Sequence, residues 1–195
     1  MSDLPRIERP RVAVSRKLLP SVESRMSQLF DVRLNEADVP LDSSALIAAM
    51  AGCDVLVPTV TDIIDADLIA NAPPRLKLIA NYGAGVDHID LVAAKAKGIM
   101  VTNTPGVFTE DTADLTMALI LSVPRRLAEG EKLVRSGKWS GWRPSGMYGR
   151  RIGGKTLGII GFGRIGEAVA ERARAFGMNV VYNKRHRLPA SVEEA

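Results

Sequence analysis

Short runs of β-branched and aliphatic residues alternate with stretches of helical periodicity along the first hundred residues. The apolar runs predict strands, and apolar positions three or four apart predict helices. This alternation predicts a parallel sheet with helices on both faces, and the fully apolar runs at 55–57 and 78–80 indicate strands buried on both sides. We expect strands at Arg11–Ser15, Asp31–Asn35, Asp54–Thr59, Leu76–Asn81 and Ile99–Asn103, and helices at Leu18–Leu29, Ser43–Met50, Asp65–Ala70 and Leu91–Lys97.

The pattern changes at Pro105, where a region of longer helices begins. A helix is expected from Thr109, whose hydroxyl is suited to cap the first N–H groups and whose first turn is acidic. Its apolar run ends before Pro124, which predicts a kink or a stop there and a second helical piece over Arg126–Arg135. The Gly- and Pro-rich stretch Ser136–Gly149 contains two tryptophans and a tyrosine, so we expect an ordered loop or arm.

A glycine pattern, Gly161-Phe-Gly-Arg-Ile-Gly166, follows the predicted strand Thr156–Ile160. It opens a predicted helix, Glu167–Phe176, which leads into another strand, Asn179–Tyr182. This context is the one in which the pattern indicates a dinucleotide site. Gly161 permits a tight turn, Gly163 lets the backbone approach a diphosphate, and Gly166 lets helix and strand pack closely. The positive end of the helix then faces the phosphates.

The end of the second strand bears on which nicotinamide cofactor is bound. NAD sites carry an acid about 20 residues after the glycines, which accepts hydrogen bonds from the ribose. Here Lys184 stands 18 residues after Gly166 and is followed by Arg185. Two cations favour a 2′-phosphate through charge-assisted hydrogen bonds. We therefore predict NADP(H) as the preferred cofactor and NAD(H) as the alternative. A solvated basic loop without a ligand remains open as a second interpretation of the tract.

Composition narrows the class of protein further. The chain has 195 residues, of which 46% are hydrophobic, and a formal net charge of +4. With 5% aromatic residues it lacks the broad basic face with interleaved aromatics that nucleic-acid readers show. No apolar run approaches a membrane span, and the charged, Pro-containing N-terminus does not fit a secretory signal. The only cysteine, Cys53, fits a reducing compartment and a packing role, so we expect a cytoplasmic protein without membrane or nucleic-acid partners.

Two further stretches, Leu78-Ile-Ala-Asn-Tyr-Gly-Ala-Gly-Val-Asp-His-Ile-Asp90 and residues 98–121, complete a pattern with residues 158–182. Together they resemble the D-2-hydroxyacid dehydrogenases, and the resemblance covers essentially the whole chain. Within that family, Trp139-Ser-Gly-Trp-Arg-Pro144 and the basic pair after the second strand look most like NADPH-linked glyoxylate and hydroxypyruvate reductases. The resemblance implies an α/β fold: a flavodoxin-like substrate domain over residues 1–104, then part of a Rossmann dinucleotide-binding domain over residues 105–195.

The resemblance also implies roles for particular residues. Backbone N–H groups at Ala84 and Gly85 would hold the carboxylate of a small 2-keto acid, which suits a loop of small residues. Thr112 would approach the nicotinamide, and a simple helix-start threonine is the alternative. Arg164 and Ile165 would contact the cofactor on its phosphate and adenine side. The long helix and the arm would build a homodimer. Trp142 is our candidate for reaching the partner's active site, and simple packing of both tryptophans is the alternative.

The arginine, glutamate and histidine that such reductases use for chemistry would all follow residue 195. The histidines present are His88, interpreted as structural, and His186, which belongs to the expected cofactor-phosphate edge. No catalytic residue is therefore assigned. We expect a C-terminally truncated chain that is inactive as given, because a positioned acid and a cationic clamp supply most of the rate enhancement. Two other hypotheses stay open: a nucleotide-sensing interaction protein of the C-terminal-binding-protein corepressor type, and a non-functional fragment.

Overall fold

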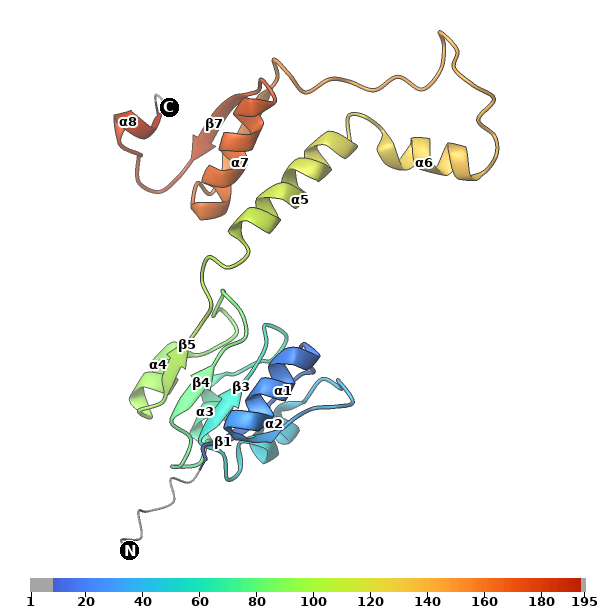
Figure 1. The fold of residues 1–195 in the computed structure, drawn as a ribbon. Helices are drawn as coiled ribbons and strands as arrows, with labels where there is room; N and C mark the ends of the chain where they lie inside the picture. Colours follow the sequence, from blue (N-terminus) through green and yellow to red (C-terminus); the bar gives the residue numbers. More distant parts are fainter. Residues whose placement is uncertain (1–8, 194–195) are drawn as a thin grey trace, which may run out of the picture. The chain divides into compact units, whose positions relative to one another are not determined.

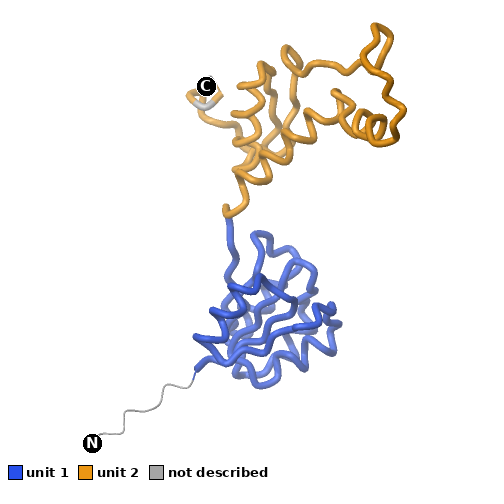
Figure 2. The backbone as a smooth tube through the Cα atoms, turned by 45° about the vertical axis from the view of Figure 1, so that its right-hand side comes forward, with its two compact units in different colours: residues 1–105 blue, residues 106–195 orange. Residues whose placement is uncertain are grey.

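The computed structural model describes residues 9–193, which form two compact units (Figure 2). The first unit ends at Pro105 and the second begins at Gly106. Residues 1–8, part of the stretch on which the expectation about a secretory signal rests, lie outside the described residues. Among the described helices, none has the length and apolar character needed to cross a bilayer.

A parallel sheet forms the centre of the first unit (Figure 1). Its five strands lie in the order β2-β1-β3-β4-β5. This order is that of flavodoxin-like folds, so the predicted fold of this part is confirmed. The strands are β1 (Arg11–Val14), β2 (Asp31–Arg33), β3 (Val55–Val57), β4 (Leu78–Ala80) and β5 (Met100–Thr102). The helices between them are α1 (Pro20–Leu29), α2 (Ser43–Met50), α3 (Ala66–Ala70) and α4 (Leu91–Ala96).

The two faces of this sheet are covered unequally. Helices α2, α3 and α4 pack on the face that carries Ala13, Leu56 and Ile79, and these side chains belong to the main core. On the opposite face α1 packs over β1 and β3. There Leu78 is half-buried and Met100 is 66% exposed. The expected burial of residues 78–80 on both sides therefore holds on one face only, because a single helix covers the other.

Three aspartates fix where the helices on the covered face begin. The carboxylates of Asp42, Asp65 and Asp90 each accept a hydrogen bond from a backbone N–H of the first turn, at 2.8 to 3.0 Å. Such caps satisfy donors that have no partner within the helix. The helix expected from Asp65 begins one residue later for this reason, since Asp65 is its N-cap.

The second unit contains a two-stranded parallel sheet flanked by helices. Its elements are α5 (Thr109–Ser122), α6 (Leu127–Arg135), β6 (Thr156–Ile160), α7 (Arg164–Ala175), β7 (Asn179–Asn183) and α8 (Ala190–Glu193). Helix α5 packs against α7 through a small core that includes Ala113 and Met117. The Arg172 guanidinium ties the two helices together, with contacts of 2.7 Å to Glu110 and 2.6 Å to Asp114.

Helix α5 ends where the sequence predicts, but its start is not capped as predicted. Thr109 is the first helical residue and Phe108 is the N-cap, without a side-chain capping bond, so the predicted capping role of Thr109 is wrong. The predicted stop near Pro124 is confirmed, because α5 ends at Ser122 and α6 begins at Leu127. Between them Arg126 adopts a left-handed conformation, with φ 54°.

Candidate functional site

The turn between β6 and α7 requires a glycine at its first position. Gly161 has φ +90°, a conformation that side-chain-bearing residues rarely adopt. Its N–H donates to the carbonyl oxygen of Asn183 at 3.0 Å, which joins the ends of β6 and β7. The first glycine of the pattern is therefore required by the backbone conformation of the turn.

The last glycine of the pattern is required by packing. A Cβ added at Gly166 would lie 2.7 Å from the carbonyl oxygen of Gly161 and 3.3 Å from Cγ2 of Ile159. Real Cβ atoms do not approach a backbone atom this closely, so the first turn of α7 can lie on β6 only without a side chain here.

Neither requirement applies to Gly163. Its φ is −103°, which any residue adopts, and a Cβ at this position would meet no atom within 4 Å. The fold itself therefore accounts for Gly161 and Gly166 but not for Gly163. Because Gly163 has no side chain, the backbone at the start of α7 is uncovered. A diphosphate needs such an uncovered backbone in order to approach closely.

Helix α7 begins three residues earlier than predicted, with Gly163 as its N-cap and no side-chain capping bond. The first hydrogen bond of the helix runs from the N–H of Glu167 to the Gly163 carbonyl, at 2.8 Å. Within residues 9–193, no acceptor meets the N–H groups of Arg164, Ile165 and Gly166. These donors and the positive end of the helix dipole form a place for an anion.

The basic tract, Lys184–Arg187, follows β7 directly. Lys184 Nζ lies 3.9 Å from Glu167 Oε1, so this side chain reaches the first turn of α7. Arg187 is already paired with Glu193, at 2.7 Å. Hydrogen bonds from Arg187, and then from the Tyr182 hydroxyl, lower the pKa of the Glu193 carboxyl to about 2. Among the described residues Arg185 has no ion-pair partner, so Lys184 and Arg185 are the cations of the tract best able to accept a ligand phosphate.

The predicted carboxylate loop follows β4 in the first unit. Within the described chain, no acceptor meets the N–H groups of Ala84 and Gly85. A Cβ added at neighbouring Gly83 would lie 2.7 Å from Cγ1 of Val60 and 3.3 Å from Nδ2 of Asn81, so a side chain would have to shift to admit it. The loop thus offers main-chain donors beside a residue that has no side chain of its own, and Asp87 Oδ2 lies 3.5 Å from the position that a Cβ on Gly85 would take.

Other residues singled out from the sequence differ in their contacts and exposure. Thr112 is in the first turn of α5, where its hydroxyl donates to the Phe108 carbonyl at 2.7 Å. His88 Nε2 lies 3.1 Å from Oδ1 of Asn81, and His186 is an exposed residue of the basic tract. Trp142 is 85% exposed, so within this chain it does not pack. Cys53 is buried, burial raises the pKa of its thiol, and its Sγ donates to the Ala49 carbonyl, in keeping with a packing role.

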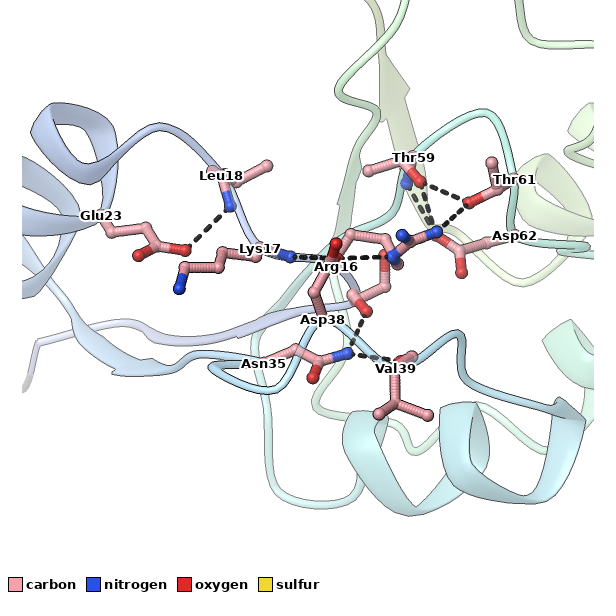
Figure 3. Close-up of polar contacts among 11 residues, drawn as sticks. Arg16, Lys17, Leu18, Glu23, Asn35, Asp38, Val39, Thr59, Thr61 and Asp62 are labelled. Carbon is pink, nitrogen blue, oxygen red and sulfur yellow. Dashed lines mark hydrogen bonds and ion pairs between the residues drawn. The ribbon is translucent and has the colours of Figure 1, made fainter.

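A second polar arrangement, at the ends of β1 and β3, was not foreseen (Figure 3). Asp62 is buried and accepts hydrogen bonds from the Ser15 hydroxyl and from the Thr59 N–H. Arg16 Nε donates to Asp38 Oδ1 at 2.8 Å, and Arg16 Nη1 donates to Thr61 Oγ1 at 3.1 Å. The one signal in the sequence is the Thr59-Val-Thr-Asp62 spacing, typical of a turn closed by a side chain. The described residues contain no group of histidine, cysteine or carboxylate side chains arranged for a metal ion.

Comparison with known proteins agrees with this architecture. The model of the catalytic domain of D-isomer specific 2-hydroxyacid dehydrogenases matches residues 12–193. A glyoxylate reductase of Thermococcus litoralis is 43% identical over 190 residues, covering 95% of this chain and 57% of that protein.

Solved structures give the same picture. The TT0316 protein from Thermus thermophilus has a TM-score of 0.84 and 46% identity, covering 92% of this chain and 57% of that chain. A protein from Polaromonas sp. JS6 66, assigned to the D-isomer specific 2-hydroxyacid dehydrogenases and described as NAD-binding, has a TM-score of 0.88 and 40% identity. Its match covers 95% of this chain and 58% of that one.

The fold and the glycine turn thus define an α/β protein with a flavodoxin-like unit followed by a strand-turn-helix-strand of the dinucleotide-binding kind. The chain belongs to the D-isomer specific 2-hydroxyacid dehydrogenase family. It spans a little over half the length of the relatives it matches.

Proposed function

We propose that the chain is part of an oxidoreductase that transfers a hydride between NADP(H) and a small 2-keto or 2-hydroxy acid, reducing glyoxylate or hydroxypyruvate. The observation that carries this proposal is the open backbone at Gly163 in front of the unpaired N–H groups of α7. A glycine that neither φ nor packing requires is accounted for by a ligand that approaches the main chain. The glyoxylate reductases among the relatives support the substrate class.

The cofactor would be held through its phosphates. In this proposal the turn from Gly161 to Gly166 takes the diphosphate, with donors from Arg164 and Ile165, and Thr112 approaches the nicotinamide. Lys184 and Arg185 take the 2′-phosphate, which favours NADP(H) over NAD(H). The bound cofactor supplies or accepts the hydride, and the residues named here bind and orient it.

The substrate carboxylate would be held by the backbone N–H groups of Ala84 and Gly85. A carboxylate accepts several hydrogen bonds at once, and successive N–H groups in a loop form a concavity suited to it. His88 is bonded to the side chain of Asn81, at the base of this loop. We therefore assign His88 no part in proton transfer.

The proposed partner is a second copy of the same chain. Leu115 and Leu119 are exposed on α5, Val123 is exposed directly after it, and Trp139 and Trp142 are exposed on the arm that follows α6. The arm and α6 also border a cavity of about 670 Å³, lined by residues such as Leu133 and Tyr148. Large apolar side chains exposed on α5 and on the arm are candidates for burial against a partner.

Isothermal titration calorimetry with NADPH and NADH tests the proposal directly. We expect saturable binding of NADPH that is stronger than binding of NADH. If neither nucleotide binds, the proposed function is contradicted. If both bind with equal affinity, only the preference for NADP(H) is contradicted. If the reading frame encodes a longer protein, that protein should reduce glyoxylate with NADPH. Binding without turnover by that protein would favour the sensing hypothesis instead.

A further inference from the structure

The loop after β4 has three consecutive carbonyl groups that are all bonded to the body of the first unit. The Gly83 carbonyl accepts from Asn81 Nδ2 at 3.1 Å and from the Thr104 N–H at 3.0 Å. The Ala84 carbonyl accepts from Asn103 Nδ2 at 2.7 Å. The Gly85 carbonyl accepts from Asn81 Nδ2 at 2.8 Å. Two asparagine side chains therefore determine the orientation of three successive peptide planes.

Fixing a carbonyl also fixes the next N–H group. The peptide unit is planar and trans, so the C=O of one residue and the N–H of the following residue point in opposite directions. Asn81, by binding the carbonyls of Gly83 and Gly85, thus orients the N–H groups of Ala84 and Val86. Asn103, by binding the Ala84 carbonyl, orients the N–H of Gly85. Over residues 9–193 these three N–H groups meet no acceptor.

Asn81 uses its whole side chain in this arrangement. Its residue is 3% exposed, and both hydrogens of Nδ2 are directed to carbonyl groups. Its Oδ1 lies 3.1 Å from His88 Nε2, which must carry the proton because an amide oxygen only accepts. His88 therefore holds the amide in the one orientation that presents Nδ2 to the loop.

We propose that Asn81 is a positioning residue for the carboxylate site, with His88 as its support and Asn103 as the equivalent for the central peptide. The inference rests on the proposed function, in which Ala84 and Gly85 bind the substrate carboxylate. Preorganised donors bind an anion without the cost of reorienting at the moment of binding. Asn81 contacts no substrate in this account, and its effect passes through the backbone.

The test uses the full chain labelled with ¹⁵N, with oxamate as the probe because it carries a carboxylate beside a carbonyl and does not react with amines. The wild-type chain should show saturable shifts of the Ala84, Gly85 and Val86 amide signals. Asn81→Asp keeps the shape but replaces both donors by acceptors facing two carbonyls. We expect it to raise the oxamate Kd about tenfold or more, as loss of two hydrogen bonds predicts.

The matched control is Asn71→Asp. Asn71 Nδ2 also donates to a backbone carbonyl, that of Asp67 at 2.8 Å, at the end of α3. This variant makes the same change of charge and loses the same kind of bond in the same unit, and its oxamate Kd should equal that of the wild type. His88→Gln, which retains a donor, should bind better than His88→Leu, which retains none. Equal binding by these two His88 variants would contradict the supporting role of His88.

A readout without ligand separates this inference from the proposed function. Amide relaxation of residues 83–86 should show a rigid loop in the wild type and a mobile loop in Asn81→Asp, while far-UV circular dichroism confirms that the variant is folded. If the wild type binds no oxamate, the carboxylate site is contradicted and relaxation decides the role of Asn81. A folded Asn81→Asp chain with a rigid loop and unchanged oxamate binding would overturn the inference.

Discussion

A Cβ added at Gly166 would lie 2.7 Å from the carbonyl oxygen of Gly161, whereas a Cβ added at Gly163 would meet no atom within 4 Å. Packing thus requires a glycine at position 166 but not at position 163. Gly166→Ala should destabilise the second unit by about 1–3 kcal/mol, as overpacking does. Gly163→Ala should lower the Tm less than Gly166→Ala does, because it meets no clash and replaces only a favoured N-cap residue, and it should weaken NADPH binding.

Thermal melts and calorimetry of both variants check this difference. Each variant serves as the control for the other, since both add one methyl group to the same turn. A Gly163→Ala chain that binds NADPH as the wild type does would show that the open space serves no ligand.

Lys184 and Arg185 should determine the choice between the two nicotinamide cofactors. Replacing both by serine removes the cations proposed for the 2′-phosphate while leaving the diphosphate turn intact. The Kd for NADPH should rise by about tenfold or more, because charge-assisted hydrogen bonds are the stronger kind. The Kd for NADH should change little. The measurement is calorimetry with both nucleotides.

Arg187→Gln is the matched control for that experiment, since Arg187 belongs to the same basic tract but is paired with Glu193. It should leave the ratio of the two affinities as it is. If the ratio of the two affinities changes in Arg187→Gln but not when Lys184 and Arg185 are replaced, the proposed position of the 2′-phosphate is wrong.

Self-association should depend on the apolar side chains of α5. Leu119 is 59% exposed, and Leu119→Lys places a charge in the proposed interface. We expect the variant to shift from dimer to monomer in size-exclusion chromatography with light scattering. Val92→Lys, at an 80% exposed position on α4, makes the same kind of change outside that surface and should remain dimeric. A wild-type chain that is monomeric at every concentration would refute the proposed homodimer.

The Arg16–Asp38 pair should give the first unit a measurable acid dependence. The hydrogen bond from Arg16, and then that from the Lys17 N–H, lower the pKa of the Asp38 carboxyl below its ordinary 3.8. A folded-state pKa below the unfolded value means that the stabilisation is complete above pH 3.8 and is lost as the pH falls through the folded-state value. Arg16→Gln should raise the pKa of Asp38 toward 3.8, which carbon-detected NMR titration measures. An unchanged Asp38 titration would exclude Arg16 as the cause.

Much of the architecture could be predicted from sequence because its signals are local. Apolar runs and turn residues place β1 to β7, and the limits of α2 and β6 agree with the predicted ones to the residue. The start of α7 could not be predicted in this way, because the helix begins at Arg164, directly after an N-cap glycine that has no side chain to signal it. Thr109 looks like a cap in sequence, but the chain is already helical there.

Some features of the candidate site could likewise be predicted from the sequence, and others could not. Glycines with a fixed spacing reveal the turn at Gly161, but only the coordinates separate a glycine needed for packing from one that leaves open space. Asn81 and Asn103 were not singled out, because their role depends on carbonyls that a sequence does not orient. The bond from Ser15 to Asp62 and the bonds from Arg16 and Lys17 to Asp38 join residues 21 to 47 positions apart, and such pairings have no local signature.

Mapping the NADPH site on the ¹⁵N-labelled chain by amide chemical shifts tests the central claim most directly. The account predicts saturable shifts at Gly163, Arg164 and Ile165, with further shifts at Lys184 and Arg185 that NADH does not produce. Saturation with NADPH that leaves the amides of residues 161–166 unmoved would contradict it.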